Sequence, residues 1–282
     1  MKKILLIVFV LCIGVSLSAQ ENKILKNKVI YPGDVKAKAI LLMDMDTKNI
    51  LYGKKIYSAL PNASTTKLLT AVVACEKLCP DDILTVTENA AKTPYNSIEF
   101  KVGETISMED CLGAMLIRSA NDASVVIAEN VAGSTEKFAE MMNEKAADLG
   151  CLNTNFVTPS GIHDPRHYST CYDLVLIGMA AKKTDLINKY INLPGFEITT
   201  RSDPKGITKI KSTNRYVLEY PYSTGAKSGY STPAGNTIVA TASKNGKNLI
   251  LVILNTDNVY DTACGIMNWG FKNPNKHIIE YK

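Results

Sequence analysis

Three short strings follow one another along the chain and together carry the groups of a serine acyl-transfer site. Ser64-Thr65-Thr66-Lys67 places a hydroxyl and an amine three residues apart, which on a helix puts both on one face. A neutral amine held there can take the proton of the hydroxyl and make it a nucleophile. Ser119-Ala120-Asn121 adds a second hydroxyl and an amide. Lys227-Ser228-Gly229 adds a cation, a third hydroxyl and a glycine with no side chain to exclude an extended substrate.

Each string alone has little specificity, because the chain repeats two of them elsewhere. Ser134-Thr135-Glu136-Lys137 and Ser202-Asp203-Pro204-Lys205 also match S-x-x-K, and Ser212-Thr213-Asn214 matches S-x-N. Ser64 differs because it opens an apolar helical run, so its hydroxyl lies at a helix N-terminus that favours a developing anion. Ser134 has the pattern of an N-cap and Ser202 that of a turn. Ser64 is therefore the candidate nucleophile.

The alternation of apolar and polar residues predicts the elements that carry these strings. Strand hairpins are expected over 39–53 and over 236–255, and Lys227-Ser228-Gly229 is expected on a strand before the second hairpin. Helices are expected from Ser64 onward and over 107–118, 123–132, 135–149 and 170–183, followed by an amphipathic stretch over 259–271. Strands at both ends predict an α+β fold of the α/β sandwich type. A mostly antiparallel sheet would be flanked by helices and carry an inserted all-helical subdomain, and the three strings would meet at the junction.

The first residues have the layout of a secretory signal peptide, because Lys2 and Lys3 precede an apolar run that ends in small residues. Export is therefore expected, to the outer face of the cell envelope or beyond it, with cleavage after Ser18 or Ala19. Retention as an N-terminal anchor is the alternative, although the run is shorter than the roughly 18 to 20 residues of a spanning helix. The expected organisation is a signal peptide over 1–19 and a single catalytic domain over 20–282, with a sheet subdomain over about 30–63 and 196–282 and a helical subdomain over about 64–195.

Composition narrows the classes of partner. The formal net charge is +5 with no basic block, which argues against nucleic acid as a partner. His163 and His167 have a spacing that could bind metal on a helix, but Gly161 and Pro165 indicate a loop, so neither a metal nor a cofactor is expected. An even number of cysteines after the leader permits disulfides, yet buried free thiols are the favoured interpretation. These cysteines are Cys75, Cys79, Cys111, Cys151, Cys171 and Cys264.

The sequence resembles the D-alanyl-D-alanine carboxypeptidase family, the low-molecular-mass penicillin-binding proteins among the serine peptidases. Besides the three strings, four blocks in order carry the resemblance, namely residues 61–67, 117–123, 155–164 and 168–174. The resemblance implies a β-lactamase/transpeptidase-like fold and removal of the terminal D-alanine from peptidoglycan stem peptides that end in D-Ala-D-Ala. It also implies β-lactam antibiotics as covalent inhibitors, and it leaves the oligomeric state open.

The resemblance further implies a role for each motif residue. Ser64 would attack the carbonyl between the two D-alanines, Lys67 would be its general base, and Ser119 would pass a proton to the leaving D-alanine. The nearby Lys227 cation would help to lower the pKa of Lys67. The substrate-binding set would be Asn121 for the backbone amide, Lys227 and Ser228 for the terminal carboxylate, and Gly229 beside an oxyanion hole formed by the backbone N–H groups of Ser64 and Tyr230.

Departures from the family pattern bear on how the function is assigned. Ser228 stands where threonine is common in the family, and serine restricts the rotamer of the hydroxyl less. Many relatives carry a further β-rich domain and a membrane anchor, but neither is expected after Phe271. A class A β-lactamase would need a glutamate for deacylation, but none occurs between Gly150 and Phe196. Two further functions stay open, an endopeptidase acting on D-alanyl cross-links and a catalytically silent wall-binding homologue.

Overall fold

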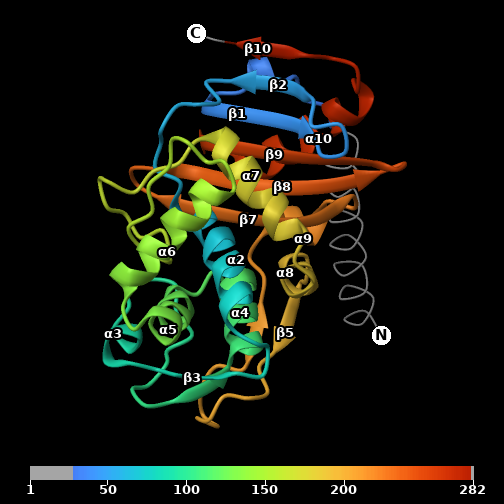
Figure 1. Ribbon diagram of the computed structural model, residues 1–282. Coiled ribbons are helices and arrows are strands. Elements are labelled where there is room, and N and C mark those ends of the chain that lie inside the picture. The colour runs from blue at the N-terminus through green and yellow to red at the C-terminus, as the bar shows by residue number, and fades with distance from the viewer. Residues whose placement is uncertain (1–27, 281–282) are drawn as a thin grey trace, which may run out of the picture.

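A six-stranded sheet forms one side of the molecule in the computed structural model, which describes residues 28–280 (Figure 1). The predicted signal peptide lies outside the described residues. All neighbouring strands are antiparallel except the pair of β10 and β2, so the expected mostly antiparallel sheet and both expected hairpins are confirmed. In spatial order the strands are β10 (Ile278–Glu280), β2 (Ile50–Lys54), β1 (Ala37–Asp44), β9 (Lys247–Thr256), β8 (Gly235–Lys244) and β7 (Ser223–Ser231).

The central strands read as nearly continuous apolar runs because both faces of the sheet are covered. Successive side chains of a strand point to opposite faces. Leu41 on β1 packs into the core shared with the inserted helices, whereas Leu42 packs into a second core beneath the last helix. Helix α7 (Cys171–Lys182) lies against β9 on one face and helix α10 (Val259–Lys272) lies against β9 on the other (Figure 1).

The inserted segment is mainly helical and lies to one side of the sheet (Figure 1). It was expected to be all helical, but it also contains a two-stranded ladder of β3 (Ile83–Thr85) with β4 (Thr105–Ser107). Strands of three residues with one or two buried side chains are too short to show a period of two. A second ladder pairs β5 (Gly195–Glu197) with β6 (Lys209–Lys211).

The helical elements follow the expected order along the chain. They are η1 (Pro32–Asp34), η2 (Ala63–Thr66), α2 (Lys67–Lys77), α3 (Glu88–Ala91), α4 (Met108–Ile117), α5 (Asn121–Ala132), α6 (Thr135–Asp148), α7, α8 (Asp185–Ile191), α9 (Arg215–Glu219) and α10. No helix within residues 28–280 is both long enough and apolar enough to cross a bilayer. The short helices α3, α8 and α9 were not predicted.

Side-chain caps fix where several of these helices begin. The Ser107 hydroxyl accepts from the Asp110 N–H at 3.2 Å, and the Thr170 hydroxyl accepts from the Asp173 N–H at 3.0 Å. The Asp110 carboxylate does not accept from the Ser107 N–H in turn. It accepts instead from the Thr199 N–H beside the β5–β6 ladder. Ser107 and Asp110 have the spacing of a capping box, but only half of it is formed, and its acidic residue ties α4 to a segment far along the chain.

All three repeated copies of the motifs have structural roles. The Ser134 hydroxyl caps α6 by accepting from the Lys137 N–H at 3.2 Å, and Asn214 caps α9 by accepting from the Tyr216 N–H at 3.1 Å. Ser202 accepts from the Thr105 N–H at 2.8 Å. The assignment of Ser134 as an N-cap is confirmed. The cysteines of the described part are all free thiols, with Cys111, Cys151, Cys171 and Cys264 buried.

A buried ion pair holds the loop that leads from α3 to β4. Arg201 pairs with Glu104, and both side chains are almost fully inaccessible. The Arg201 guanidinium also donates to the carbonyls of Ile98 and Glu99 at 2.8 and 3.0 Å. Because a buried charge is costly unless its partners are satisfied, these contacts fix the path of the loop.

Candidate active site

The first motif forms a 3₁₀ turn that runs into a helix. Ser64 lies in η2 and Lys67 is the first residue of α2. The Lys67 Nζ atom is 2.9 Å from the Ser64 hydroxyl, Ser64 is half buried, and Lys67 is completely buried. The two side chains therefore lie on one face, as their spacing predicted.

Lys67 has a set of partners that suits a neutral amine. Its Nζ atom lies 2.7 Å from Asn121 Oδ1 and 2.6 Å from the Ser160 carbonyl, in addition to the Ser64 hydroxyl. A neutral amine has two N–H groups for the two carbonyl oxygens and one lone pair for the hydroxyl proton of Ser64. Burial lowers the pKa of Lys67 well below its usual value, and the Lys227 charge lowers it further. The larger cause is burial, whereas the sequence pointed only to Lys227.

The second and third motifs meet through a lysine–serine contact. Lys227 Nζ donates to the Ser119 hydroxyl at 2.8 Å and to the Ser228 carbonyl at 2.8 Å. Burial lowers the pKa of Lys227 to about 7. Ser119 has a φ of +64°, an uncommon value for a residue other than glycine, and it aims the hydroxyl at Lys227. Ser119 therefore has a direct proton route to Lys227.

Asn121 is the first residue of α5, although the sequence predicted a connecting loop there. Its backbone N–H donates to the Asn96 carbonyl at 2.6 Å, and its side-chain nitrogen donates to the Pro94 carbonyl at 3.1 Å. Its Nδ2 group has two N–H donors and uses one for Pro94, so one side-chain N–H is left, while Oδ1 accepts from Lys67. Asn121 thus positions the amine and keeps one free donor.

Gly229 allows β7 to approach Ser64. A Cβ atom built on this residue would lie 2.6 Å from the backbone nitrogen of Ser64 and 3.0 Å from the Ala63 Cβ. β7 is the edge strand of the sheet, so alternate N–H groups along it point away from β8. Tyr230 follows with its side chain 68% exposed. The Ser64 amide and β7 therefore lie side by side at Gly229.

Ser228 contacts a residue that the sequence did not single out. Its hydroxyl oxygen is 3.2 Å from the phenol oxygen of Tyr260, which is half buried at the second residue of α10. The two residues are 32 positions apart. Neither spacing nor composition relates them, so no sequence signal could have revealed this pair.

His167 contacts the turn that carries Ser64, through Thr66. Its Nδ1 atom accepts from the N–H groups of Val157 and Thr158 at 3.1 and 3.3 Å, and its Nε2 atom is 2.8 Å from the Thr66 hydroxyl. Since that hydroxyl donates to the Ala63 carbonyl, Nε2 carries the proton and donates. Burial lowers the pKa of His167 to about 4. The histidines lie on a loop, as the sequence indicated, and His167 holds the segment that presents the Ser160 carbonyl to Lys67.

The neutral state of His167 predicts how stability depends on pH. Its pKa is about 4 in the folded protein and about 6.5 when unfolded, so the unfolded chain binds more protons between these values. The contribution of His167 is therefore complete above pH 6.5 and falls by about 3 kcal/mol as pH drops towards 4. Urea unfolding should show His167→Gln to be less stable than the parent at pH 7.5 by about 2 kcal/mol, with the gap narrowing at pH 4.5.

A gap that stays constant between the two pH values would contradict this role. His163→Gln is the matched control, because His163 is exposed four residues earlier on the same loop. Exposed substitutions away from such contacts change stability by about 0.5 kcal/mol or less.

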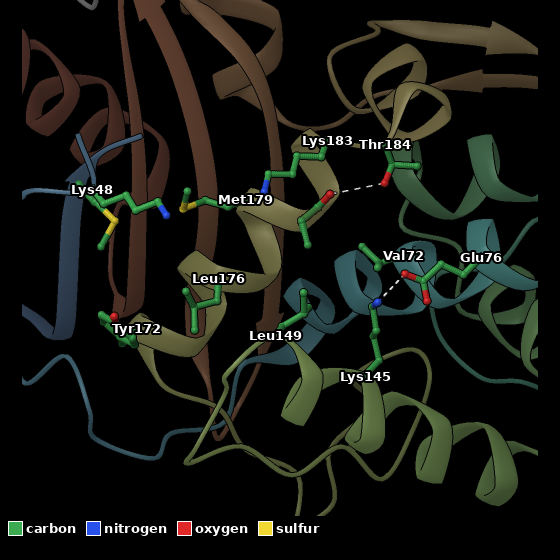
Figure 2. Close-up of a pocket in the computed structure, with 12 residues that line it drawn as sticks. Lys48, Val72, Glu76, Lys145, Leu149, Tyr172, Leu176, Met179, Lys183 and Thr184 are labelled. Carbon is green, nitrogen blue, oxygen red and sulfur yellow. Dashed lines mark hydrogen bonds and ion pairs between the residues drawn. The ribbon is translucent and has the colours of Figure 1, made fainter. Parts of the chain in front are cut away.

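A cavity of about 430 Å³ lies elsewhere, between α2, α6 and α7 (Figure 2). Val72, Leu176 and Met179 supply apolar lining, and Lys145 pairs with Glu76 at 2.5 Å beside it. None of the predicted site residues lines this cavity. The candidate active site is therefore defined by the convergence of the three motifs and is separate from this cavity.

Comparisons with known proteins agree with this geometry. A family model described as D-alanyl-D-alanine carboxypeptidase matches residues 25–258. DacF of Bacillus subtilis, a D-alanyl-D-alanine carboxypeptidase, is 33% identical over 222 residues, which are 77% of this chain and 57% of DacF. DacC of Escherichia coli, which has the same description, is 32% identical over 255 residues, 84% of this chain and 62% of DacC. The chain thus spans only part of the length of these two relatives.

A solved structure shares the fold. The crystal structure of a D-alanyl-D-alanine carboxypeptidase from Mycobacterium tuberculosis superimposes with a TM-score of 0.83 at 27% sequence identity. The match covers 89% of this chain and 97% of that one. The expected β-lactamase/transpeptidase-like architecture is confirmed by this likeness.

Proposed function

Since the chain belongs to the D-alanyl-D-alanine carboxypeptidase family, we propose that it removes the terminal D-alanine from peptidoglycan stem peptides that end in D-Ala-D-Ala. The observation that carries this proposal is the contact between the fully buried Lys67 amine and the Ser64 hydroxyl. An amine kept neutral by burial is a general base that works near neutral pH. The proposed chemistry uses neither a metal nor a cofactor.

The acylation half-reaction follows from the contacts at Ser64. The lone pair of Lys67 takes the hydroxyl proton while Ser64 Oγ bonds to the carbonyl carbon between the two D-alanines. The oxyanion then accepts from the N–H groups of Ser64 and Tyr230, beside Gly229. When the C–N bond breaks, the leaving amine receives a proton from Ser119, which Lys227 replenishes. D-Alanine departs and the stem peptide stays as an ester on Ser64.

Deacylation reverses these roles with water as the nucleophile. Before this step Lys67 must be neutral again and Lys227 charged again, so the proton gained by Lys67 is lost to solvent and Lys227 regains one from solvent. Water then attacks the ester carbonyl and gives a proton to neutral Lys67, and Lys67 passes that proton to the departing Ser64 oxygen. Asn121 keeps one N–H for the substrate backbone, while Lys227 and Ser228 lie where the terminal carboxylate would bind. β-Lactams would acylate Ser64 by the same attack and deacylate slowly, because the segment between Gly150 and Phe196 offers no glutamate.

We also propose that the chain is exported and acts on the cell wall, with residues 20–282 belonging to its catalytic domain. The basic and apolar leader supports export. The proposed partner is the peptidoglycan stem peptide, and nucleic acid is not proposed as a partner.

Labelling with a fluorescent penicillin, followed by mass spectrometry on a stem pentapeptide, tests the proposal. The parent should bind the label stably and remove one D-alanine, and Ser64→Ala should do neither. Ser134→Ala is the matched control from the repeated S-x-x-K motif. It loses the cap of α6, at a stability cost of about 1 kcal/mol, but keeps both activities.

Three different outcomes would contradict the proposal. Cleavage of cross-linked peptides without trimming of the pentapeptide would identify an endopeptidase. A lack of Ser64-dependent label would identify a silent wall-binding protein, and rapid repeated turnover of nitrocefin would identify a β-lactamase.

A further inference from the structure

Carboxylates in proteins are commonly bound by arginine, whose planar guanidinium offers two parallel N–H donors. The chain contains four arginines, all in its described part, and each has a partner other than Ser228, although Arg215 also lies 3.8 Å from Asp261, the residue after Tyr260. Their partners are the Ser97 carbonyl for Arg118, Asp164 for Arg166, Glu104 for Arg201, and Glu219 for Arg215. A terminal carboxylate held at the third motif must therefore find other donors.

Lys227 supplies only part of what a carboxylate needs. Two of the three donor directions of its amine are taken by the Ser119 hydroxyl and the Ser228 carbonyl. At most one N–H is left for a ligand, and the fully charged form is disfavoured by burial. Two carboxylate oxygens have about four acceptor positions between them, so at least one more donor is required.

The hydroxyls of Ser228 and Tyr260 provide these donors as a pair. Their oxygens are 3.2 Å apart, so in the free protein one hydroxyl donates to the other. Both residues are half buried and so remain accessible to a ligand. Tyr260 is in the first turn of α10, whose N-terminal end favours negative charge. The neighbouring Asp261 accepts from the Asn258 side chain at 2.9 Å, and its charge is partly balanced by Arg215, whose guanidinium lies 3.8 Å from the other carboxylate oxygen.

We propose that Tyr260 is a substrate-binding residue whose phenol, together with the Ser228 hydroxyl, receives the carboxylate of the terminal D-alanine. In the free enzyme the two hydroxyls hydrogen-bond to each other. When substrate binds, they rotate so that both O–H groups donate to its carboxylate. The rigid phenol thus compensates for the serine that stands where the family commonly has threonine. The inference rests on the proposed function, because it assigns the group that the enzyme recognises at the end of its substrate.

Binding measured without turnover separates this inference from the proposed function. In a Ser64→Ala background, calorimetric titration would compare a D-Ala-D-Ala peptide with a free carboxylate and the same peptide as its C-terminal amide. The free acid is expected to bind more tightly. Adding Tyr260→Phe should weaken binding of the acid by about 10-fold or more, as for a lost hydrogen bond to a charged group, and should change binding of the amide by less than about 2-fold.

Kinetics with Ser64 intact give a second readout. For the Tyr260→Phe single variant, kcat/KM should fall for an acyl-D-alanyl thioester with a mercaptoacetate leaving group and stay constant for its methyl ester. Tyr57→Phe is the matched control, because Tyr57 is 61% exposed and its ring stacks on Tyr172. It should behave as the parent with both substrates.

Two results would overturn the inference. An equal loss with acid and neutral ligands would assign Tyr260 a structural role, and an unchanged preference for the acid would leave the carboxylate to Lys227 or to Arg215. The protein could also prefer the acid through Tyr260 and yet never remove D-alanine from a pentapeptide. That result would refute the proposed function and support the binding role of Tyr260.

Discussion

Lys67→Met should acylate Ser64 about 100- to 10,000-fold more slowly than the parent, which is the range that a positioned general base contributes. Methionine fills a similar volume but has no lone pair basic enough to take the Ser64 proton. The measurement is the time course of labelling by a fluorescent penicillin. A parent-like rate in Lys67→Met would show that another group removes the proton and would refute the assignment of Lys67 as the base.

Further variants separate the base from the charge and from the fold. Lys67→Arg keeps a cation at the site but cannot lose its proton near neutral pH, so it should be as slow as Lys67→Met. Lys137→Met changes the exposed lysine of the repeated motif at Ser134 and should label at the parent rate. Thermal unfolding of each variant would show whether loss of the Lys67 contacts to Asn121 and Ser160 also costs stability.

The pH dependence of labelling follows from the same contacts. Burial and the Lys227 charge lower the pKa of Lys67, so the free amine persists to lower pH than for an ordinary lysine. The acylation rate should therefore stay high through neutral pH and fall only when Lys67 gains a proton in more acidic solution. In Lys67→Met this limb of the profile should disappear.

Local spacing explains why part of the site could be predicted. Ser64 and Lys67 belong to one turn and are three residues apart, so their contact follows from helical geometry alone. The Ser119–Lys227 contact joins residues 108 positions apart, and the sequence predicted only that their two strings meet at the junction of the subdomains, not this contact itself. The Thr66–His167 contact, over 101 positions, had no such guide. The contact joins a residue on a loop to one beside a helix, and such a contact leaves no periodic pattern of apolar residues in either segment.

The fold shows the same division between local and distant signals. The β8–β9 hairpin was predicted because its Asn-Gly turn and apolar strands are adjacent in the chain. β10 was missed, since its three residues pair with β2 more than two hundred positions earlier. The start of the helix at Ser107 was predicted from local spacing, but the contact of Asp110 with the Thr199 N–H, 89 positions away, was not.

Gly229→Ala should lower the acylation rate about 100- to 1,000-fold, the range for loss of one oxyanion-hole donor. The added methyl would lie 2.6 Å from the Ser64 nitrogen, closer than Cβ atoms approach such atoms in proteins. Either β7 or the η2 turn must move, and the Thr237 hydroxyl resists this because it lies 3.2 Å from both the Gly229 and Asn62 carbonyls. The Ser64 N–H is then displaced from the oxyanion.

The decisive measurement for Gly229→Ala is the labelling rate alongside the melting temperature. Gly246→Ala is the control, because Gly246 has a φ of +75° and open space around its Cβ position. That substitution should cost about 1 kcal/mol of stability through backbone strain while the label forms at the parent rate. A Gly229→Ala protein that labels as fast as Gly246→Ala would mean that the Ser64 N–H does not stabilise the oxyanion, because the methyl group cannot be placed without displacing it.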